Sequence, residues 1–220
     1  MAGNIATADG AKRLIAAGAD ILRVGMGPGS ICTTRIVTGM GVPQLTAIQE
    51  VTKITRITNT TRKTNITVVA DGGIRQIGDM AKALAAGASA VMLGSLLAGF
   101  DESPGEAIEL KGKKYKQYRG MGSVAAMQKG SAERYGQSSQ TKERSLIAEG
   151  VEGLVPYKGA VADYLDQIAG SLKSSFYYIG GKTLKDFQKN VQFIRITPAS
   201  MAESHPHSIT VVEAGKNYQR

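Results

Sequence analysis

Two ten-residue segments have nearly the same pattern and decide the fold class: AAGADILRVG at residues 16–25 and AAGASAVMLG at residues 85–94. Each pattern predicts an alanine-rich helix that ends at a glycine, then a short apolar strand that ends at a second glycine. Glycine just past a helix supplies a left-handed cap, and a continuous apolar strand is typical of a parallel sheet covered on both faces. The repeat therefore predicts successive strand and helix units around a parallel sheet.

The segments around this repeat extend the same order. Residues 44–57 predict a helix, residues 66–70 an apolar strand, and residues 1–4 the end of a preceding strand. Such alternation is typical of an α/β barrel or a doubly wound sheet. In a parallel barrel the loops that follow the strands gather on one face, where chemistry is found. Here these loops are residues 25–34, 71–73 and 94–95.

Beyond residue 101 the pattern changes. Residues 107–118 alternate around a glycine turn and predict a hairpin, and residues 128–150 are polar without strong periodicity. A long irregular segment in a compact domain is usually a lid or an insert. Helical patterns return at about residues 160–173 and 184–190, and the polar tail is too short to form a core.

Composition limits the class of protein. The chain has 220 residues, 42% of them hydrophobic, which is near the lower end for one α/β barrel. Its single cysteine excludes an intramolecular disulfide and fits a reducing compartment. There is no apolar run of membrane-spanning length and no signal-like N-terminus. We therefore expect a cytoplasmic protein without a membrane partner.

The net charge of +9 admits several interpretations. The basic residues are scattered, apart from a cluster at residues 111–116 on the predicted hairpin tip. A positive surface attracts phosphorylated small molecules, but it can also be an ordinary solvated surface. A nucleic-acid-binding module would use this cluster with Tyr115 and Tyr118, and is the least favoured interpretation because the charge is not concentrated.

The single cysteine, Cys32, ends a glycine-rich loop directly after the strand at residues 21–24. Glycines let a backbone approach a ligand closely, and an activated thiol there could attack an electrophilic carbon. The alternative is a small buried hydrophobe. Asp71 similarly ends a strand, either facing ribose hydroxyls or capping the next helix. The glycines of residues 72–73 and 94 either bind phosphate or only form turns.

Seven motifs, in order, resemble the inosine 5′-monophosphate (IMP) dehydrogenase family. They lie at residues 25–34, 68–74, 81–98, 118–123, 133–135, 149–150 and 203–207. The resemblance implies an α/β fold, a (β/α)₈ TIM barrel, of which this chain would be the C-terminal half-barrel. It further implies one catalytic domain over residues 1–220, with a mobile flap at about 120–150 and a C-terminal tail at about 198–220. The N-terminal half-barrel and the regulatory tandem module of many members would be absent.

The same resemblance implies the chemistry. Cys32 would add to C2 of the hypoxanthine ring of IMP, and hydride would pass to NAD. The covalent thioimidate would then be hydrolysed to xanthosine 5′-monophosphate. Arg134 and Tyr135 match the flap pair that activates water, and Thr34 joins that step.

Substrate and cofactor contacts are implied residue by residue. Asp71 would bind the ribose hydroxyls, and Glu149 would face the base. The other substrate-binding residues would be Ser30, Gly72, Gly73, Gly94, Ser95, Tyr118, Gly120, Met121 and Gly122, of which Ser30, Gly73, Gly94, Ser95 and Tyr118 hold the phosphate. The cofactor-binding residues would be Gly25, Met26 and Gly27.

The family also binds potassium, K⁺, at the cysteine loop. The resemblance assigns three of its ligands to the backbone carbonyls of Gly27, Gly29 and Cys32. A neighbouring subunit of a homotetramer would complete the site with Glu203, Ser204 and His205. Neutral carbonyl oxygens suit a monovalent hard cation.

Two alternatives remain within this resemblance. GMP reductase shares the cysteine and phosphate loops but lacks the water-activating pair, so residues 133–135 and the tail favour the dehydrogenase. A catalytically silent truncated homologue with only an assembly role is the other alternative. The aspartate that contacts the nicotinamide side of NAD in the family would be absent together with the first half of the barrel.

Overall fold

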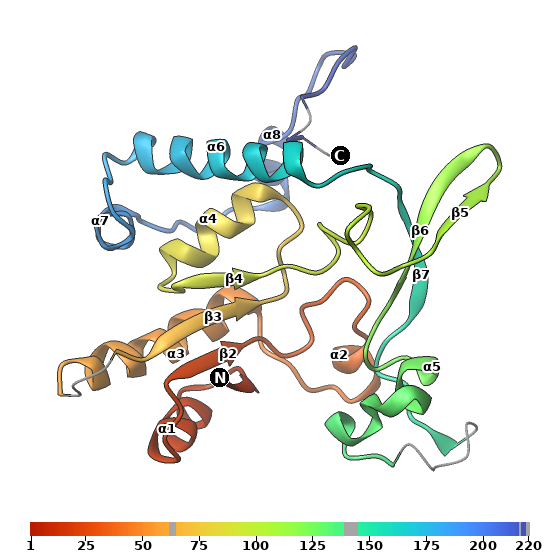
Figure 1. Cartoon of the computed structure of the whole chain (residues 1–220). Helices are drawn as coiled ribbons and strands as arrows, with labels where there is room; N and C mark the ends of the chain where they lie inside the picture. Colours follow the sequence, from red (N-terminus) through yellow and green to blue (C-terminus); the bar gives the residue numbers. More distant parts are fainter. Residues whose placement is uncertain (62–64, 139–144, 216, 219–220) are drawn as a thin grey trace.

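The computed structural model describes residues 1–61, 65–138, 145–215 and 217–218. Its centre is a four-stranded parallel sheet in the order β1-β2-β3-β4. The strands are β1 (Ala2–Ile5), β2 (Ile21–Val24), β3 (Thr67–Asp71) and β4 (Ala90–Met92). Helices α1 (Ala8–Ala16), α3 (Gln44–Asn59) and α4 (Ile77–Ala85) connect successive strands (Figure 1). Sequential parallel strands with a helix in each connection form part of a (β/α)₈ barrel, so the predicted fold class is confirmed.

The core lies between this sheet and its helices. Leu22 and Val24 of β2 and Val68 of β3 are fully or almost fully buried, and they belong to one cluster with Ile48 and Val51 of α3. Successive side chains of a strand point to opposite faces, so one face of each strand packs on the helices.

The other face of the sheet differs from expectation. The intervening residues of β2 and β3 are only partly buried. Within the described residues the second face of the sheet is thus only partly covered, as expected for part of a barrel. An apolar strand predicts burial, but the strand sequence alone does not show how much of the second face the chain covers.

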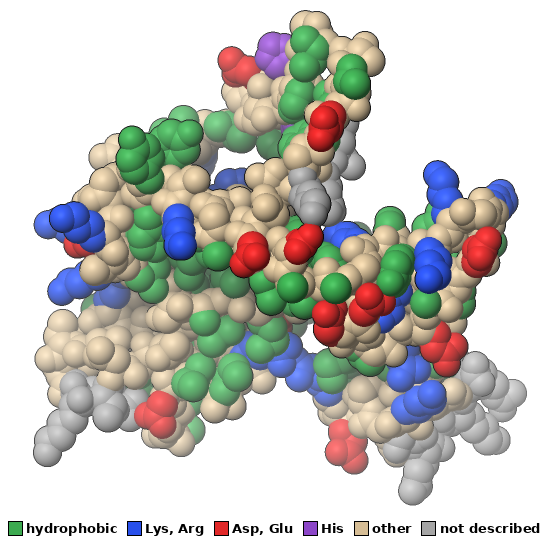
Figure 2. Space-filling model, turned by 45° about the horizontal axis from the view of Figure 1, so that its top comes forward, with side chains coloured by type: hydrophobic (Ala, Val, Ile, Leu, Met, Phe, Trp, Pro, Cys, Tyr) green, Lys and Arg blue, Asp and Glu red, His purple; other side chains and the backbone are tan. Residues whose placement is uncertain are grey.

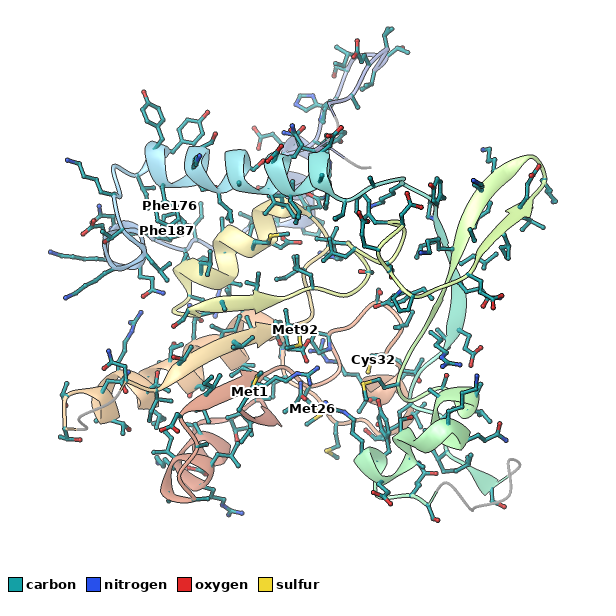
Figure 3. The ribbon with its side chains drawn as sticks, viewed as in Figure 1. Met1, Met26, Cys32, Met92, Phe176 and Phe187 are labelled. Carbon is teal, nitrogen blue, oxygen red and sulfur yellow. The ribbon has the colours of Figure 1, made fainter. Side chains whose placement is uncertain are left out.

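Helices on the outer side complete this layer. Helix α6 (Ala162–Tyr178) runs five residues further than the predicted end, and α7 (Leu184–Asn190) has the predicted bounds. Ile168 and Leu172 of α6 pack against buried Met80 of α4. Phe176 and Phe187 stack at 4.3 Å between ring centroids and hold α7 against α6 (Figure 3).

A second sheet stands beside the carboxyl ends of the parallel strands (Figure 1). The predicted hairpin is confirmed as β5 (Ala107–Leu110) and β6 (Lys113–Arg119), and a third antiparallel strand, β7 (Glu152–Pro156), pairs with β6. Strand β7 was not predicted, because most of its residues are exposed and its sequence lacks alternation. Lys and Arg side chains gather at the hairpin tip (Figure 2).

Short helical turns fill the segment between β6 and β7. They are α5 (Val124–Ala126), a π-helix (Met127–Ser131) and a 3₁₀-helix (Ala132–Tyr135). The predicted flap at 120–150 includes residues 139–144, which lie outside the described residues. The tail contains a short helix that was not predicted, α8 (Pro198–Glu203), and residues 216, 219 and 220 of the tail also lie outside the description. Within the described ranges, no helix has the length and apolarity to cross a bilayer.

Candidate active site

The loop from Gly25 to Thr33 carries Cys32 between β2 and the four-residue helix α2 (Thr34–Val37). A Cβ atom on Gly25 would lie 2.1 Å from the backbone oxygen of Asp71, so only glycine permits this approach of β2 to β3. Arg35 holds the loop from the other side, since its Nε donates to the Met26 carbonyl at 3.1 Å. The loop is therefore fixed at both ends.

Cys32 is partly buried, and its thiol donates to Thr34 Oγ1 at 3.1 Å. The Cys32 amide donates to the Gly29 carbonyl at 3.1 Å, which closes a tight turn around the thiol. Figure 3 shows Cys32 between the carboxyl ends of the parallel strands and the helical turns that follow β6. The thiol thus lies where a ligand could reach it from the sheet side.

Asp71, the last residue of β3, is bound by the adjacent strand β2 and by β1 beyond it. Its Oδ2 accepts from Arg23 Nε of β2 at 2.8 Å and from Asn4 Nδ2 of β1 at 2.8 Å. Both bonds end on the same oxygen, so Oδ1 makes no hydrogen bond within the described residues. A fixed carboxylate with one free oxygen suits a ligand hydroxyl.

The flap residues reach the same place. Arg134 donates to Asn4 Oδ1, which connects the flap to β1. Burial raises the pKa of Tyr135, with Cys32 and Glu149 adding to the rise and Arg134 opposing it. These influences place Tyr135 near the thiol, and its hydroxyl keeps its proton at neutral pH.

The end of the flap is bonded directly to the cysteine loop. The Thr33 amide donates to the Glu149 carbonyl at 2.9 Å, and the Val151 amide donates to the Ile31 carbonyl at 3.0 Å. Cys32 therefore pairs with Gly150 as an isolated antiparallel bridge.

The predicted phosphate residues are brought together only in part. Tyr118 and Ser30 are hydrogen-bonded, and a Cβ on Gly94 would lie 2.7 Å from the Tyr118 hydroxyl. Burial raises the pKa of Tyr118, with Asp71 adding to the rise and the bond to Ser30 opposing it. Ser95 follows Gly94 in the same turn, whereas Gly73 packs beside Gln44 and Pro28.

One cavity of about 470 Å³ unites most of these groups. The predicted site residues that line it are Gly25, Met26, Gly27, Gly29, Cys32, Thr34, Asp71, Gly72, Gly120, Met121, Gly122, Arg134, Tyr135 and Glu149. The five predicted phosphate residues do not line it.

The tail residues lie apart from the cysteine loop within this chain. His205 lines a separate cavity of about 810 Å³ between α4 and the tail, with Arg75 and Lys82. No predicted catalytic residue lines this larger cavity. In the described parts of the chain, no three His, Cys, Asp or Glu side chains gather in a metal-binding group. A K⁺ site built from carbonyls does not depend on such a group.

Sequence reasoning missed Asn4 and Arg23. Arg23 interrupts an otherwise apolar strand, and a charged residue inside such a strand needs a partner. That signal could have found it. Asn4 gave no comparable signal, because its partners Gly25, Asp71 and Arg134 lie 21, 67 and 130 positions away in the sequence.

Comparisons with known proteins identify the family of the chain. The family model described as "IMP dehydrogenase / GMP reductase domain" matches residues 1–207. An inosine-5′-monophosphate dehydrogenase of Rhizobium tropici is 56% identical over 211 residues, 96% of this chain and 41% of the relative. The enzyme of the same name from Methanocaldococcus jannaschii is 53% identical, over 98% of this chain and 44% of the relative.

A solved structure shows the same likeness. It is a GMP reductase variant from Trypanosoma brucei in complex with guanosine 5′-monophosphate, with a TM-score of 0.82 and 44% identity. The match covers 94% of this chain and 40% of that one. The chain thus spans about two fifths of the length of the relatives it matches. With its parallel strands, its cysteine loop and these matches, the chain belongs to the IMP dehydrogenase / GMP reductase family.

Proposed function

We propose that this chain supplies the cysteine and flap half of an IMP dehydrogenase active site, which oxidises IMP to xanthosine 5′-monophosphate. One observation carries the proposal: Cys32 lies in a single cavity with Asp71 and with the flap residues Arg134 and Tyr135. A nucleophile, a ribose-binding carboxylate and two groups suited to act on water are the parts that this reaction needs.

The reaction divides into two steps. In the first, Cys32 Sγ bonds to C2 of the hypoxanthine ring, and the hydrogen on C2 leaves with its electron pair. NAD, when bound, accepts that hydride. In the second, water adds to C2, the C2–S bond breaks, and the thiol is restored. One IMP, one NAD⁺ and one water thus give one xanthosine 5′-monophosphate, one NADH and one proton.

The chain's own residues have distinct tasks in these steps. Thr34 Oγ1 accepts a hydrogen bond from the Cys32 thiol and orients Sγ. Arg134 is bonded to Tyr135 and Asn4, which holds the pair over the cavity. A guanidinium keeps its charge in nearly any setting and is therefore an unusual base. The assignment of water activation to Arg134 thus rests on the family resemblance and not on the chemistry of the side chain.

Backbone groups at the loop fit the two expected cofactors. Gly25, Met26 and Gly27 line the cavity and would face NAD. The Gly29 carbonyl accepts a hydrogen bond from the Cys32 amide and has a second lone pair that could bind K⁺. The carbonyls of Gly27 and Cys32 would be the other two ligands from this loop. The assembly that goes with this proposal is a cytoplasmic homotetramer, in which a neighbouring tail completes the ion site.

GMP reductase is the second candidate, because a solved GMP reductase shares this fold at 44% identity. Its intermediate is not hydrolysed, so the Arg134–Tyr135 pair over the cavity favours the dehydrogenase.

The test compares two assays on the chain alone and on the chain mixed with the N-terminal part of the Rhizobium tropici relative. The proposal expects NADH formation from IMP and NAD in the mixture. Consumption of GMP with a reduced nicotinamide cofactor would indicate a reductase instead. If the mixture shows neither activity, the assembly role is the function that remains.

A further inference from the structure

Lys116 of β6 is a buried lysine that the proposed reaction does not use. Only 4% of its surface is exposed, whereas Lys113 and Lys114 of the same strand are exposed. Lysine is almost never fully buried unless its charge has partners. The position of this ammonium group therefore requires a specific cause.

The partners are three backbone carbonyls of one loop. Lys116 Nζ donates to the Phe100 carbonyl at 2.8 Å, to the Asp101 carbonyl at 3.2 Å and to the Ser103 carbonyl. An ammonium group has three donors, so these bonds satisfy it completely. The three carbonyls converge on it as they would on a bound cation.

This loop is the continuation of the turn that carries Gly94 and Ser95. Successive bonds link it, from the Leu97 amide to the Gly94 carbonyl and from the Phe100 amide to the Leu97 carbonyl. Phe100 then packs against Tyr164 of α6, with ring centroids 5.1 Å apart. The loop after β4 thus runs from the predicted phosphate turn to the carbonyls that bind the Lys116 ammonium. Figure 1 shows this loop passing from β4 toward β6.

Strand β6 touches this loop at both ends. Lys116 holds the far end, and Tyr118 lies against Gly94 at the near end. The two side chains are two positions apart on one strand, so they share a face and are separated by about 6.6 Å along it. Movement at Lys116 would therefore be transmitted to the contact between Tyr118 and the Gly94 turn.

We propose that Lys116 is a positioning residue for the phosphate subsite: its ammonium group fixes the loop after β4 at the spacing from Tyr118 that a nucleotide phosphate needs. This inference rests on the proposed function, because it takes Tyr118, Gly94 and Ser95 as phosphate contacts. Within the described residues, loss of the ammonium removes the donor of the Asp101 and Ser103 carbonyls and leaves the Phe100 carbonyl only the Ser103 amide, so the loop shifts to reach water. The base and ribose contacts come from other loops and stay in place.

The test measures how much the phosphate contributes to binding. Dissociation constants for IMP and for inosine, the same nucleoside without phosphate, are measured by titration calorimetry on the chain and on Lys116→Met. The ratio of the inosine constant to the IMP constant is expected to fall at least 10-fold in Lys116→Met. The matched control, Lys113→Met on the same strand, is expected to keep the ratio within about 2-fold, a range within which exposed substitutions normally fall.

Each outcome has a defined meaning. A folded Lys116→Met with an unchanged ratio overturns the inference, as does equal weakening of IMP and inosine. If circular dichroism shows that Lys116→Met does not fold, Lys116→Gln is measured instead, and an unchanged ratio there overturns it equally. An unsubstituted chain that binds IMP no better than inosine contradicts the phosphate subsite, and so the proposed function itself.

Discussion

Arg23 Nε donates to Asp71 Oδ2 at 2.8 Å, across two adjacent strands of the parallel sheet. Arg23 lies opposite Val69 in the register, two positions before Asp71, so both side chains project from the same face. The side chains are 26% and 21% exposed, which limits screening by water. This ion pair fixes the carboxylate that would bind ribose.

The strength of this pair can be measured with a double-mutant cycle of Arg23→Met and Asp71→Asn in urea unfolding. We expect a coupling energy of about 1–2 kcal/mol, because the residues are in contact and largely shielded. The exposed pair of Lys12 and Asp9, at 3.4 Å, is the control and should couple by less than about 0.5 kcal/mol. Equal coupling in both pairs would show that shielding adds nothing at Asp71.

Cys32 should react selectively with an electrophilic 6-substituted purine nucleotide, because the cavity would bind the reagent beside the thiol. We expect one label per chain by intact mass spectrometry, protection by IMP, and no labelling of Cys32→Ala. Since Cys32 is the only cysteine of the chain, the label needs no further assignment. Labelling that saturating IMP does not slow would return Cys32 to a structural role.

Arg134→Ala should separate the two chemical steps in the barrel-complete enzyme. On the proposed mechanism hydrolysis would need the flap, whereas hydride transfer would need only the thiol and NAD, so a burst of NADH should precede slow turnover in stopped-flow absorbance. Lys129→Ala, an exposed change in the same flap, should give no burst. If hydride transfer and hydrolysis slow equally, Arg134 positions substrate and does not activate water.

Potassium activation should depend on the tail. In a barrel-complete enzyme, deletion of residues 203–220 should abolish K⁺ activation and leave IMP binding largely intact, because the carbonyls of the cysteine loop would supply only one side of the ion site. Sodium should substitute poorly, since the larger K⁺ ion better suits a loose ring of carbonyls. Steady-state rates in KCl and NaCl measure both effects, and equal rates in the two salts would remove the ion from the mechanism.

Asp79 should make stability depend on pH. The pKa of Asp79 is lowered from its ordinary value of 3.8. Burial raises this pKa, but the hydrogen bonds from the Arg75 and Gln76 amides and the charge of Lys82 together lower it by more. Because the folded pKa lies below the unfolded one, the stabilisation is complete above pH 3.8 and is lost as pH falls through the folded value. Asp79→Asn should therefore cost about 1 kcal/mol at pH 7, a typical helix-cap value, and progressively less in acid.

Urea unfolding of Asp79→Asn between pH 2 and pH 7 checks this expectation. Glu109→Gln, an exposed change on the hairpin, is the control and should shift stability by less than about 0.5 kcal/mol at any pH. A constant difference between Asp79→Asn and the unsubstituted chain across the range would contradict the linkage.

The sequence predicted the parts of the fold that depend on local periodicity. The strands at Ile21–Val24 and Thr67–Asp71 and the hairpin are close to their predicted bounds, because apolar runs and glycine ends mark them locally. Strand β7 was not predictable, since its partner β6 supplies the pairing and its own residues are mostly exposed.

The candidate site shows the same division. Cys32 was proposed because it ends a glycine-rich loop after a strand, and Asp71 because it ends a strand directly before two glycines. The Asn4 contacts to Asp71 and Arg134 join distant parts of the chain, and only the folded sheet brings them together. The burial of Lys116 could not be predicted either, because a run of lysines is typical of a solvated hairpin tip and the carbonyls that bind Lys116 belong to another loop.

The paired ends of the flap have a consequence for how such proteins diversify. The Glu149 amide donates to the Gly122 carbonyl, and the Gly120 amide donates to the Val151 carbonyl, both at 2.9 Å, so the chain leaves and returns at one point. Lengthening a loop whose ends are already joined has a small entropic cost. The segment between these bonds can therefore change in length over evolutionary time while the Cys32 loop beside it keeps its place.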